Sequence, residues 1–374
     1  MWSAPKCARF NLTAEKNLLR APARTRSGCL EAILSGASFS NVDDKLHLWD
    51  DHSEDSSCTR LLEHSFSVVK HLRRLNASSP PLHNSAGSVL MLGDSRDRFL
   101  VDHLCQCRRS REWIPGGSDI NGRNGVLCQL WAGGAVGHFH NFGVGLEPYP
   151  AQWLAHLVPG CSATAESGKV LCLRNNSFQR VQHDVTLFRH AVRGRPAADP
   201  SLIVVHSDAW EHSKWWIKAG MPKHTHWCDL RHVTAWMPFA LAYLKTVQQT
   251  FPRATVVWRT DTFPHAHFAA GQFYKASPEC VGAMNQAMRH AAPRQGVHVL
   301  ELDAVFRAFR YDWDGVHPDR NAVTQSDAIW ALIYSILHLV EHPSPLLQRV
   351  AVAGGVEGRA ASIFKLREIQ NLVS

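Results

Sequence analysis

The sequence has no long hydrophobic run. No stretch of its 374 residues approaches the roughly 18 consecutive apolar residues that a membrane-spanning helix requires. The longest candidate, Ala328 to Val340, is typical of a helix packed in a protein core. We therefore expect no transmembrane segment.

The N-terminus also lacks the short apolar core of a secretory signal. Its first thirty residues are rich in Arg, Lys and Ala and contain one acidic residue, Glu15. A transit peptide, a cytosolic arm or an incomplete gene model would each fit this pattern.

Acidic residues are fewer than basic ones, yet no basic run stands out. The chain has 40 Lys and Arg against 32 Asp and Glu, which gives a formal net charge of +8. The basic residues are scattered, and a typical cluster is only Arg108, Arg109 and Arg111. Nucleic-acid binding would need a basic face with interleaved aromatic residues or a known module, and the sequence shows neither. We expect a solvated basic surface and no nucleic-acid partner.

Cysteine is not scarce. There are ten cysteines, and glycosylation sequons occur at Asn11, Asn76 and Asn175. Both features allow a disulfide-bearing protein of the secretory pathway. The sequence leaves the compartment and the disulfide pattern open.

The fold class follows from short apolar runs that alternate with helical patterns. Each run has a length suited to a strand buried on both faces: Val89 to Leu92, Val126 to Leu130, Leu202 to Val205, Thr255 to Trp258 and Val297 to Leu302. Helical spacing is found at Cys58 to Leu75, Asp97 to Cys105, Trp236 to Val247 and Ile329 to Val340. This alternation predicts an α/β fold with a mostly parallel sheet, whose chemistry lies at the carboxyl ends of its strands.

Changes in composition and regularity along the chain predict three regions. Residues 1–85 form a partly irregular lead-in, residues 86–342 the catalytic domain, and residues 343–374 a peripheral tail. The long irregular segments 161–200 and 214–231 are more typical of substrate-binding insertions than of a core.

The strongest local motif is an apolar strand that ends in Gly93-Asp94-Ser95 and runs into a helix. A serine there sits on a tight strand-to-helix turn, where glycine permits close backbone passage. The amides of the helix N-terminus then point toward a developing oxyanion. A turn with a helix cap is the other interpretation, because Asp and Ser are favoured caps.

A second motif lies just before the last core helix and contains Asp314 and His317. A serine hydroxyl needs a histidine to take its proton, and a carboxylate fixes the tautomer of that imidazole. Asp314 and His317 can supply both groups, although Asp-Gly and His-Pro are also common in turns. The two motifs together predict a catalytic triad with Ser95.

These residues resemble the first and last sequence blocks of the SGNH/GDSL hydrolase superfamily. Arg96 and Arg98, the segment around Trp258-Arg259-Thr260 and the segment Val204 to Trp210 further resemble its PC-esterase and trichome-birefringence-like branch. The resemblance implies a three-layer α/β/α sandwich and an esterase or O-acetyltransferase that acts mostly on glycans, without a cofactor or metal. It also implies an acyl-Ser95 intermediate and favours the secretory pathway or Golgi.

The oxyanion hole departs from the pattern of this superfamily. His206 stands where asparagine is expected, although an imidazole can also donate a hydrogen bond. The glycine of the oxyanion hole is Gly133, Gly134 or Gly137, and we take Gly133 as the candidate. Arg259 is a further candidate for binding substrate, with a surface or salt-bridge role as the alternative.

Two rival functions fit other features. A metal-dependent esterase would use the His-x-His pairs, the second of which is followed by Cys228, but a complete set of ligands is absent from the sequence: His138/His140, His224/His226 and His265/His267. A catalytically silent SGNH module would bind glycans through aromatic loops: Trp210, Trp215, Trp216 and Trp227. The acyl donor and acceptor, hydrolysis against transfer, and the oligomeric state stay open.

Overall fold

A computed structural model describes the following residues: 29–30, 33–34, 39–42, 45–48, 56–74, 87–105, 112–115, 123–131, 134–140, 143–144, 162–163, 170–171, 199–207, 210–212, 215, 219–220, 228–261, 278–303, 305 and 323–341.

A seven-stranded sheet forms the centre of the fold, with the strand order β11-β10-β9-β3-β6-β5-β4. Its strands are β3 (Ser88–Gly93), β4 (Glu112–Pro115), β5 (Arg123–Trp131), β6 (Gly134–His140), β9 (Pro200–Val205), β10 (Thr255–Arg259) and β11 (His298–Leu300). The pairs from β11 to β6 are parallel, whereas β6, β5 and β4 run antiparallel to one another. The predicted mostly parallel sheet is confirmed, and all five predicted strands lie in it.

Two short antiparallel pairs lie outside this sheet. One joins β1 (Phe39–Val42) to β2 (Lys45–Leu48), and the other joins β7 (Ser162–Ala163) to β8 (Val170–Leu171).

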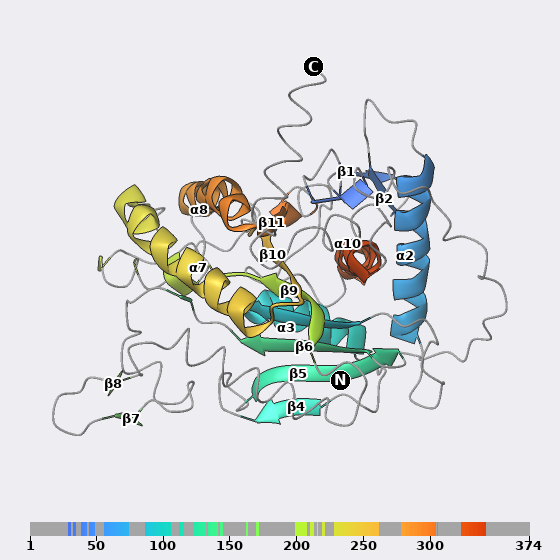
Figure 1. The fold of residues 1–374 in the computed structure, drawn as a ribbon, viewed down its shortest axis with the longest axis horizontal. Coiled ribbons are helices and arrows are strands. Elements are labelled where there is room, and N and C mark those ends of the chain that lie inside the picture. Colours follow the sequence, from blue (N-terminus) through green and yellow to red (C-terminus); the bar gives the residue numbers. More distant parts are fainter. Residues whose placement is uncertain are drawn as a thin grey trace, which may run out of the picture.

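The sheet is covered by helices on both faces. Alternate side chains of a strand point to opposite faces, so Val89 and Met91 of β3 join one hydrophobic cluster while Leu90 and Leu92 join the other. The first face carries α2 (Ser56–Arg74), α3 (Ser95–Cys105) and α10 (Val323–Glu341), and the second carries α7 (Leu230–Thr250) and α8 (Pro278–Ala291). Figure 1 shows α7 and α8 on the side opposite α2 and α10. The predicted three-layer α/β/α sandwich is confirmed.

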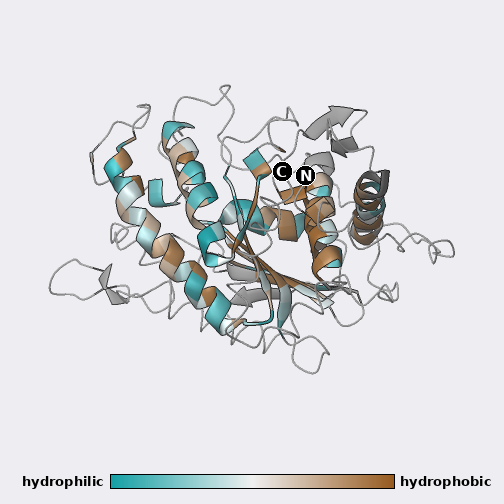
Figure 2. Ribbon diagram, turned by 45° about the horizontal axis from the view of Figure 1, so that its top comes forward, coloured by the Kyte–Doolittle hydropathy of each residue, from teal (hydrophilic) through white to brown (hydrophobic). Residues whose placement is uncertain are grey.

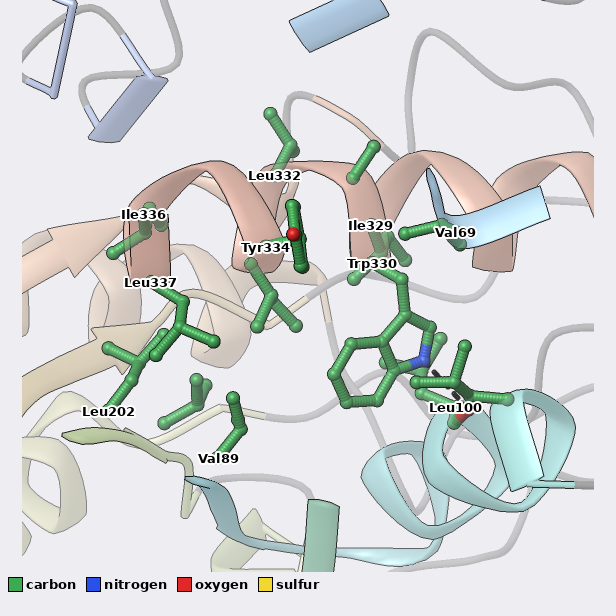
Figure 3. Packing of buried hydrophobic residues seen from close by; sticks show 14 of the residues in the cluster. Val69, Val89, Leu100, Leu202, Ile329, Trp330, Leu332, Tyr334, Ile336 and Leu337 are labelled. Atoms are coloured by element: carbon green, nitrogen blue, oxygen red, sulfur yellow. Dashed lines mark hydrogen bonds between the residues drawn. The ribbon is translucent and has the colours of Figure 1, made fainter. Parts of the chain in front are cut away.

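Helix α10 is the most deeply buried helix of the first face. Its residues from Ala328 to Leu337 are all buried, and Figure 3 shows their side chains above Val89 and Leu202 of the sheet. The indole Nε1 of Trp330 donates a hydrogen bond of 2.8 Å to the carbonyl oxygen of Leu100 in α3. A helix that is apolar on all sides belongs inside a protein. Figure 2 shows mainly hydrophobic residues along α10, whereas hydrophobic and hydrophilic residues alternate along α7.

Helix α2 packs directly on α10, although it lies in the predicted lead-in of residues 1–85. The hydroxyl of Ser335 donates to the hydroxyl of Ser65 at 2.6 Å, and Leu62, Val69 and Leu72 join the core of the first face. The division into lead-in, catalytic domain and tail stays a prediction, and the predicted tail lies outside the described residues.

Among the described residues, three disulfides join separate elements. Cys105 at the end of α3 is bonded to Cys128 of β5, Cys228 before α7 to Cys280 of α8, and Cys29 to Cys58 of α2. Within the described part of the chain, no helix is both long and apolar enough to cross a membrane.

Candidate active site

Ser95 is the first residue of α3, and one residue, Asp94, separates it from the end of β3. The Asp94 carboxylate accepts a hydrogen bond of 2.8 Å from the Arg96 amide, and its carbonyl accepts one of 3.2 Å from the Arg98 amide. Asp94 is therefore a helix cap, as the alternative interpretation of the motif required. Ser95 itself is half-buried. The cap and the candidate nucleophile are thus neighbouring residues with separate roles.

The turn lies where the carboxyl ends of three adjacent parallel strands meet. Strand β3 lies beside β9, with Leu92 opposite Val205, and β10 is the next strand along. The amide of His206 donates to the carbonyl of Leu92 at 2.9 Å, which fixes the end of β9 against β3. The strands that follow β3 first in the sequence, β4 to β6, lie on one side of it, and the later strands β9 to β11 lie on the other. The carboxyl end of β3 is therefore the switch point at which α/β proteins bind ligands.

A buried ion pair lies beneath the turn. Arg259, at the end of β10, donates from Nε to Asp97 Oδ1 at 2.6 Å and from Nη2 to Asp97 Oδ2 at 2.8 Å. Both side chains are about 1% exposed. Burial alone would lower the pKa of Arg259, but Asp97 and Asp94 raise it above its usual value. Burial raises the pKa of Asp97, and the two-pronged contact with Arg259 opposes that rise.

A second buried ion pair holds Arg96. Its Nη1 donates to Oδ1 of Asp261, which follows β10. The backbone of Asp261 is held in turn by Asn285 of α8, which accepts from the Asp261 amide at 2.9 Å and donates to its carbonyl at 3.0 Å. The residue after Ser95 is thereby connected to the helix layer on the far face of the sheet.

His206 lies at the end of β9 and is fully buried. Its Nε2 is 3.6 Å from Asp94 Oδ2 and 3.8 Å from Asp261 Oδ1. Burial would raise the pKa of Asp94, but the adjacent His206, with Arg96 and Arg259, holds it well below its usual range. Asp94 is therefore a carboxylate at neutral pH. A role of His206 in the oxyanion hole stays a prediction.

His138 of β6 supports the turn from the other side. Its Nε2 lies 2.9 Å from the carbonyl oxygen of Asp94 and 3.2 Å from that of Gly93. Burial, together with the nearby Arg98 charge, lowers the pKa of His138 to about 3. The imidazole is neutral at pH 7, so Nε2–H donates to these carbonyls. The sequence offered this residue only as half of a metal-binding pair, and the β3–β6 pairing that places it opposite Met91 was the missing information.

Other predicted residues lie outside the described part of the chain. These are Asp314, His317 and Gly133, along with the histidine pairs at 224/226 and 265/267. Cys228, a possible zinc ligand, is bonded to Cys280. Among the described residues there is no group of three or more His, Cys, Asp or Glu that could hold a metal ion. The structure thus brings together Ser95, His206 and Arg259 of the predicted site.

Comparisons with known proteins found similarity to solved structures and none to known sequences. No family model matches the sequence, and no curated protein gives a significant match. A GDSL-like lipase from Bacteroides thetaiotaomicron is similar at a TM-score of 0.34 and 13% identity, over 73% of this chain and 98% of its own. A phospholipase A1 from Streptomyces albidoflavus is similar at a TM-score of 0.33 and 14% identity, over 67% of this chain and 99% of its own. A peptidoglycan O-acetylesterase is similar at a TM-score of 0.30 and 11% identity, over 75% of this chain and 96% of its own.

Proposed function

We propose that this protein is a serine-dependent acyl ester hydrolase or O-acyltransferase with Ser95 as the nucleophile. The observation that carries the proposal is the position of Ser95 at the first residue of α3, at the carboxyl end of the central strand β3. The positive end of a helix dipole favours the negative charge that forms on an attacked carbonyl. Resemblance of the Gly-Asp-Ser and Asp-x-x-His motifs to SGNH/GDSL hydrolases supports the same function.

The reaction needs a base and an orienting carboxylate, which we assign to His317 and Asp314. His317 removes the Ser95 hydroxyl proton as Oγ attacks the ester carbonyl, and Asp314 stabilises the imidazolium. Collapse of the tetrahedral intermediate breaks the ester bond, and the departing alkoxide takes the proton from His317. This leaves acyl-Ser95. Water or an acceptor hydroxyl, deprotonated by His317, then attacks the acyl group, the bond to Ser95 Oγ breaks as Oγ takes the proton back from His317, and the acid or a new ester is released.

The oxyanion is stabilised in this proposal by the Ser95 amide with Gly133 and His206 as further donors. The Arg96 amide is not available for this task, because it donates to the Asp94 carboxylate. Loss of one well-placed donor typically costs about 10²–10³ in rate.

An acetyl ester on a glycan is the substrate class that we propose, on the basis of the PC-esterase resemblance. The aromatic residues near the site contribute unequally to this idea. Trp215 is buried, with its ring stacked on His232 at a centroid distance of 5.4 Å. Trp210 is partly exposed, and is the described aromatic residue that could contact a sugar ring.

Labelling with a fluorophosphonate tests the nucleophile. We expect the wild-type protein and Ser207→Ala to be labelled and Ser95→Ala to remain unlabelled, because Ser207 lies two residues after the end of β9 and, unlike Ser95, does not begin a helix. Label that persists in Ser95→Ala would remove the proposed nucleophile. Turnover of an acetyl ester should survive chelation, and a loss that zinc restores would instead support the metal-dependent alternative.

A further inference from the structure

We infer that Arg259 is a positioning residue that fixes Ser95 through Asp97, an inference that rests on the proposed role of Ser95 as nucleophile. The ion pair connects the end of β10 to the first turn of α3, and Asp97 lies two residues after Ser95 in that turn. Arg259 would thus act without contacting the substrate.

The geometry of the pair restricts both partners. Two parallel N–H to carboxylate bonds, of 2.6 and 2.8 Å, fix the orientation of the guanidinium and the carboxylate together. Both groups are buried, so when the contact is lost, water cannot take the place of the missing partner. Breaking such a pair from one side leaves an uncompensated buried charge.

The same guanidinium also faces the residue before the nucleophile. Its Nη2 lies 3.6 Å from Asp94 Oδ1, and its Nη1 lies 3.5 Å from Asp261 Oδ1. Arg259 therefore contacts carboxylates on both sides of Ser95 in the sequence. A planar guanidinium with five donors can do this while it forms two parallel bonds to one carboxylate, which the ammonium of lysine cannot reproduce.

Gly93 completes the support of the turn. A Cβ atom at this position would overlap Oδ2 of Asp97 and lie 2.6 Å from its Cγ. The Asp97 carboxylate is thus packed directly against the end of β3 while Arg259 holds it from β10. The ends of β3 and β10 and the first turn of α3 are fixed relative to one another by this one contact.

A rate effect follows from this geometry. A displacement of about 1 Å at a reacting group can reduce turnover by about 10²-fold. We expect Arg259→Lys to reduce kcat and the rate of fluorophosphonate labelling by about 10²-fold with little change in KM, because the substrate is not bound by this side chain.

The chain offers a matched control in a second two-pronged ion pair. Arg289 of α8 donates to both carboxylate oxygens of Glu301, at 2.6 and 2.7 Å, beside the edge strand β11, which is three strands away from β3 in the sheet. Arg289→Lys should lower thermal stability slightly and leave labelling and kcat at wild-type values. A stability effect common to any broken arginine pair is thereby separated from an effect on the nucleophile.

Each outcome decides the inference. A folded Arg259→Lys that is labelled at the wild-type rate overturns it, and so does a raised KM with unchanged kcat, which would make Arg259 a substrate contact. If Arg259→Lys does not fold, Asp97→Asn, which keeps the shape of the side chain, should show the same slow labelling. Failure of both variants to fold while Arg289→Lys folds would make the pair a folding element and reject the positioning role. If the wild-type protein is not labelled, the proposed function itself is wrong.

Discussion

His138 Nε2 lies 2.9 Å from the carbonyl oxygen of Asp94, so a neutral imidazole on one strand holds the residue before the candidate nucleophile on the next. Burial holds the pKa of His138 at about 3 in the folded protein, whereas an unfolded histidine has a pKa near 6.5. Between these values the unfolded chain binds a proton that the folded protein does not. Stability is therefore fully present above about pH 6.5 and is lost as pH falls toward 3.

His138→Asn should flatten this pH dependence. The wild-type free energy of unfolding should fall by about 1.4 kcal/mol per pH unit through this one group, and the variant should lack that contribution. Losing the buried donor should also destabilise the variant by about 1–3 kcal/mol at pH 7. Urea unfolding between pH 4 and 7 measures both effects, with the exposed His290→Asn as control. Equal slopes for His138→Asn and the wild type would show that His138 is not held neutral.

Gly93→Ala should destabilise the protein by about 1–3 kcal/mol, because the added methyl group forces the Asp97 carboxylate away from its place beside Arg259. Gly282 of α8 is the control, since a Cβ atom there meets nothing within 4 Å. Gly282→Ala should gain up to about 1 kcal/mol from helix propensity. Chemical unfolding of the two variants checks the contrast, and a neutral Gly93→Ala would mean that the carboxylate can move at little cost.

Trp330→Phe should lower the free energy of unfolding more than Trp236→Phe does. Trp330 donates to the Leu100 carbonyl at 2.8 Å, and its loss leaves a buried acceptor without that donor, at a cost of about 1–3 kcal/mol. The indole nitrogen of Trp236 is also buried but has no hydrogen-bond partner among the described residues. Both changes remove similar volume, so the difference in unfolding midpoint reports the hydrogen bond.

The three disulfides between described cysteines predict maturation in an oxidising compartment. Removing the bond between Cys105 and Cys128 by a double alanine substitution should cost about 2–4 kcal/mol, since it closes a loop of 23 residues between α3 and β5. Peptide mapping without reduction should recover the three pairs. Free thiols at these positions in the native protein would contradict both expectations.

Sequence patterns predicted the elements whose residues share one chemical character. The strands β3, β9 and β10 read as apolar runs because both of their faces are buried. Strand β6 was missed because two glycines and two histidines interrupt its apolar residues. Helix α8 was missed because its buried face includes Cys280 and Asn285 as well as aliphatic residues.

The candidate site was predictable only where its residues are neighbours in sequence. The Gly-Asp-Ser turn is local, so its cap and its helix could be expected. Arg259 and Asp97 are separated by 162 residues, and their contact depends on the order of strands in the sheet. Neither hydrophobic periodicity nor a short motif contains that order. His138 was hidden for the same reason, since only the register of β6 on β3 places it behind the turn.

The contact between Ser65 of α2 and Ser335 of α10 joins residues 270 positions apart. During synthesis at about 5–20 residues per second, α2 leaves the ribosome roughly ten seconds to a minute before its partner. Its apolar face must be shielded from other chains over that interval, and the first-face core can close only when α10 emerges. The order in which the two helices are made therefore predicts that this core closes late in synthesis.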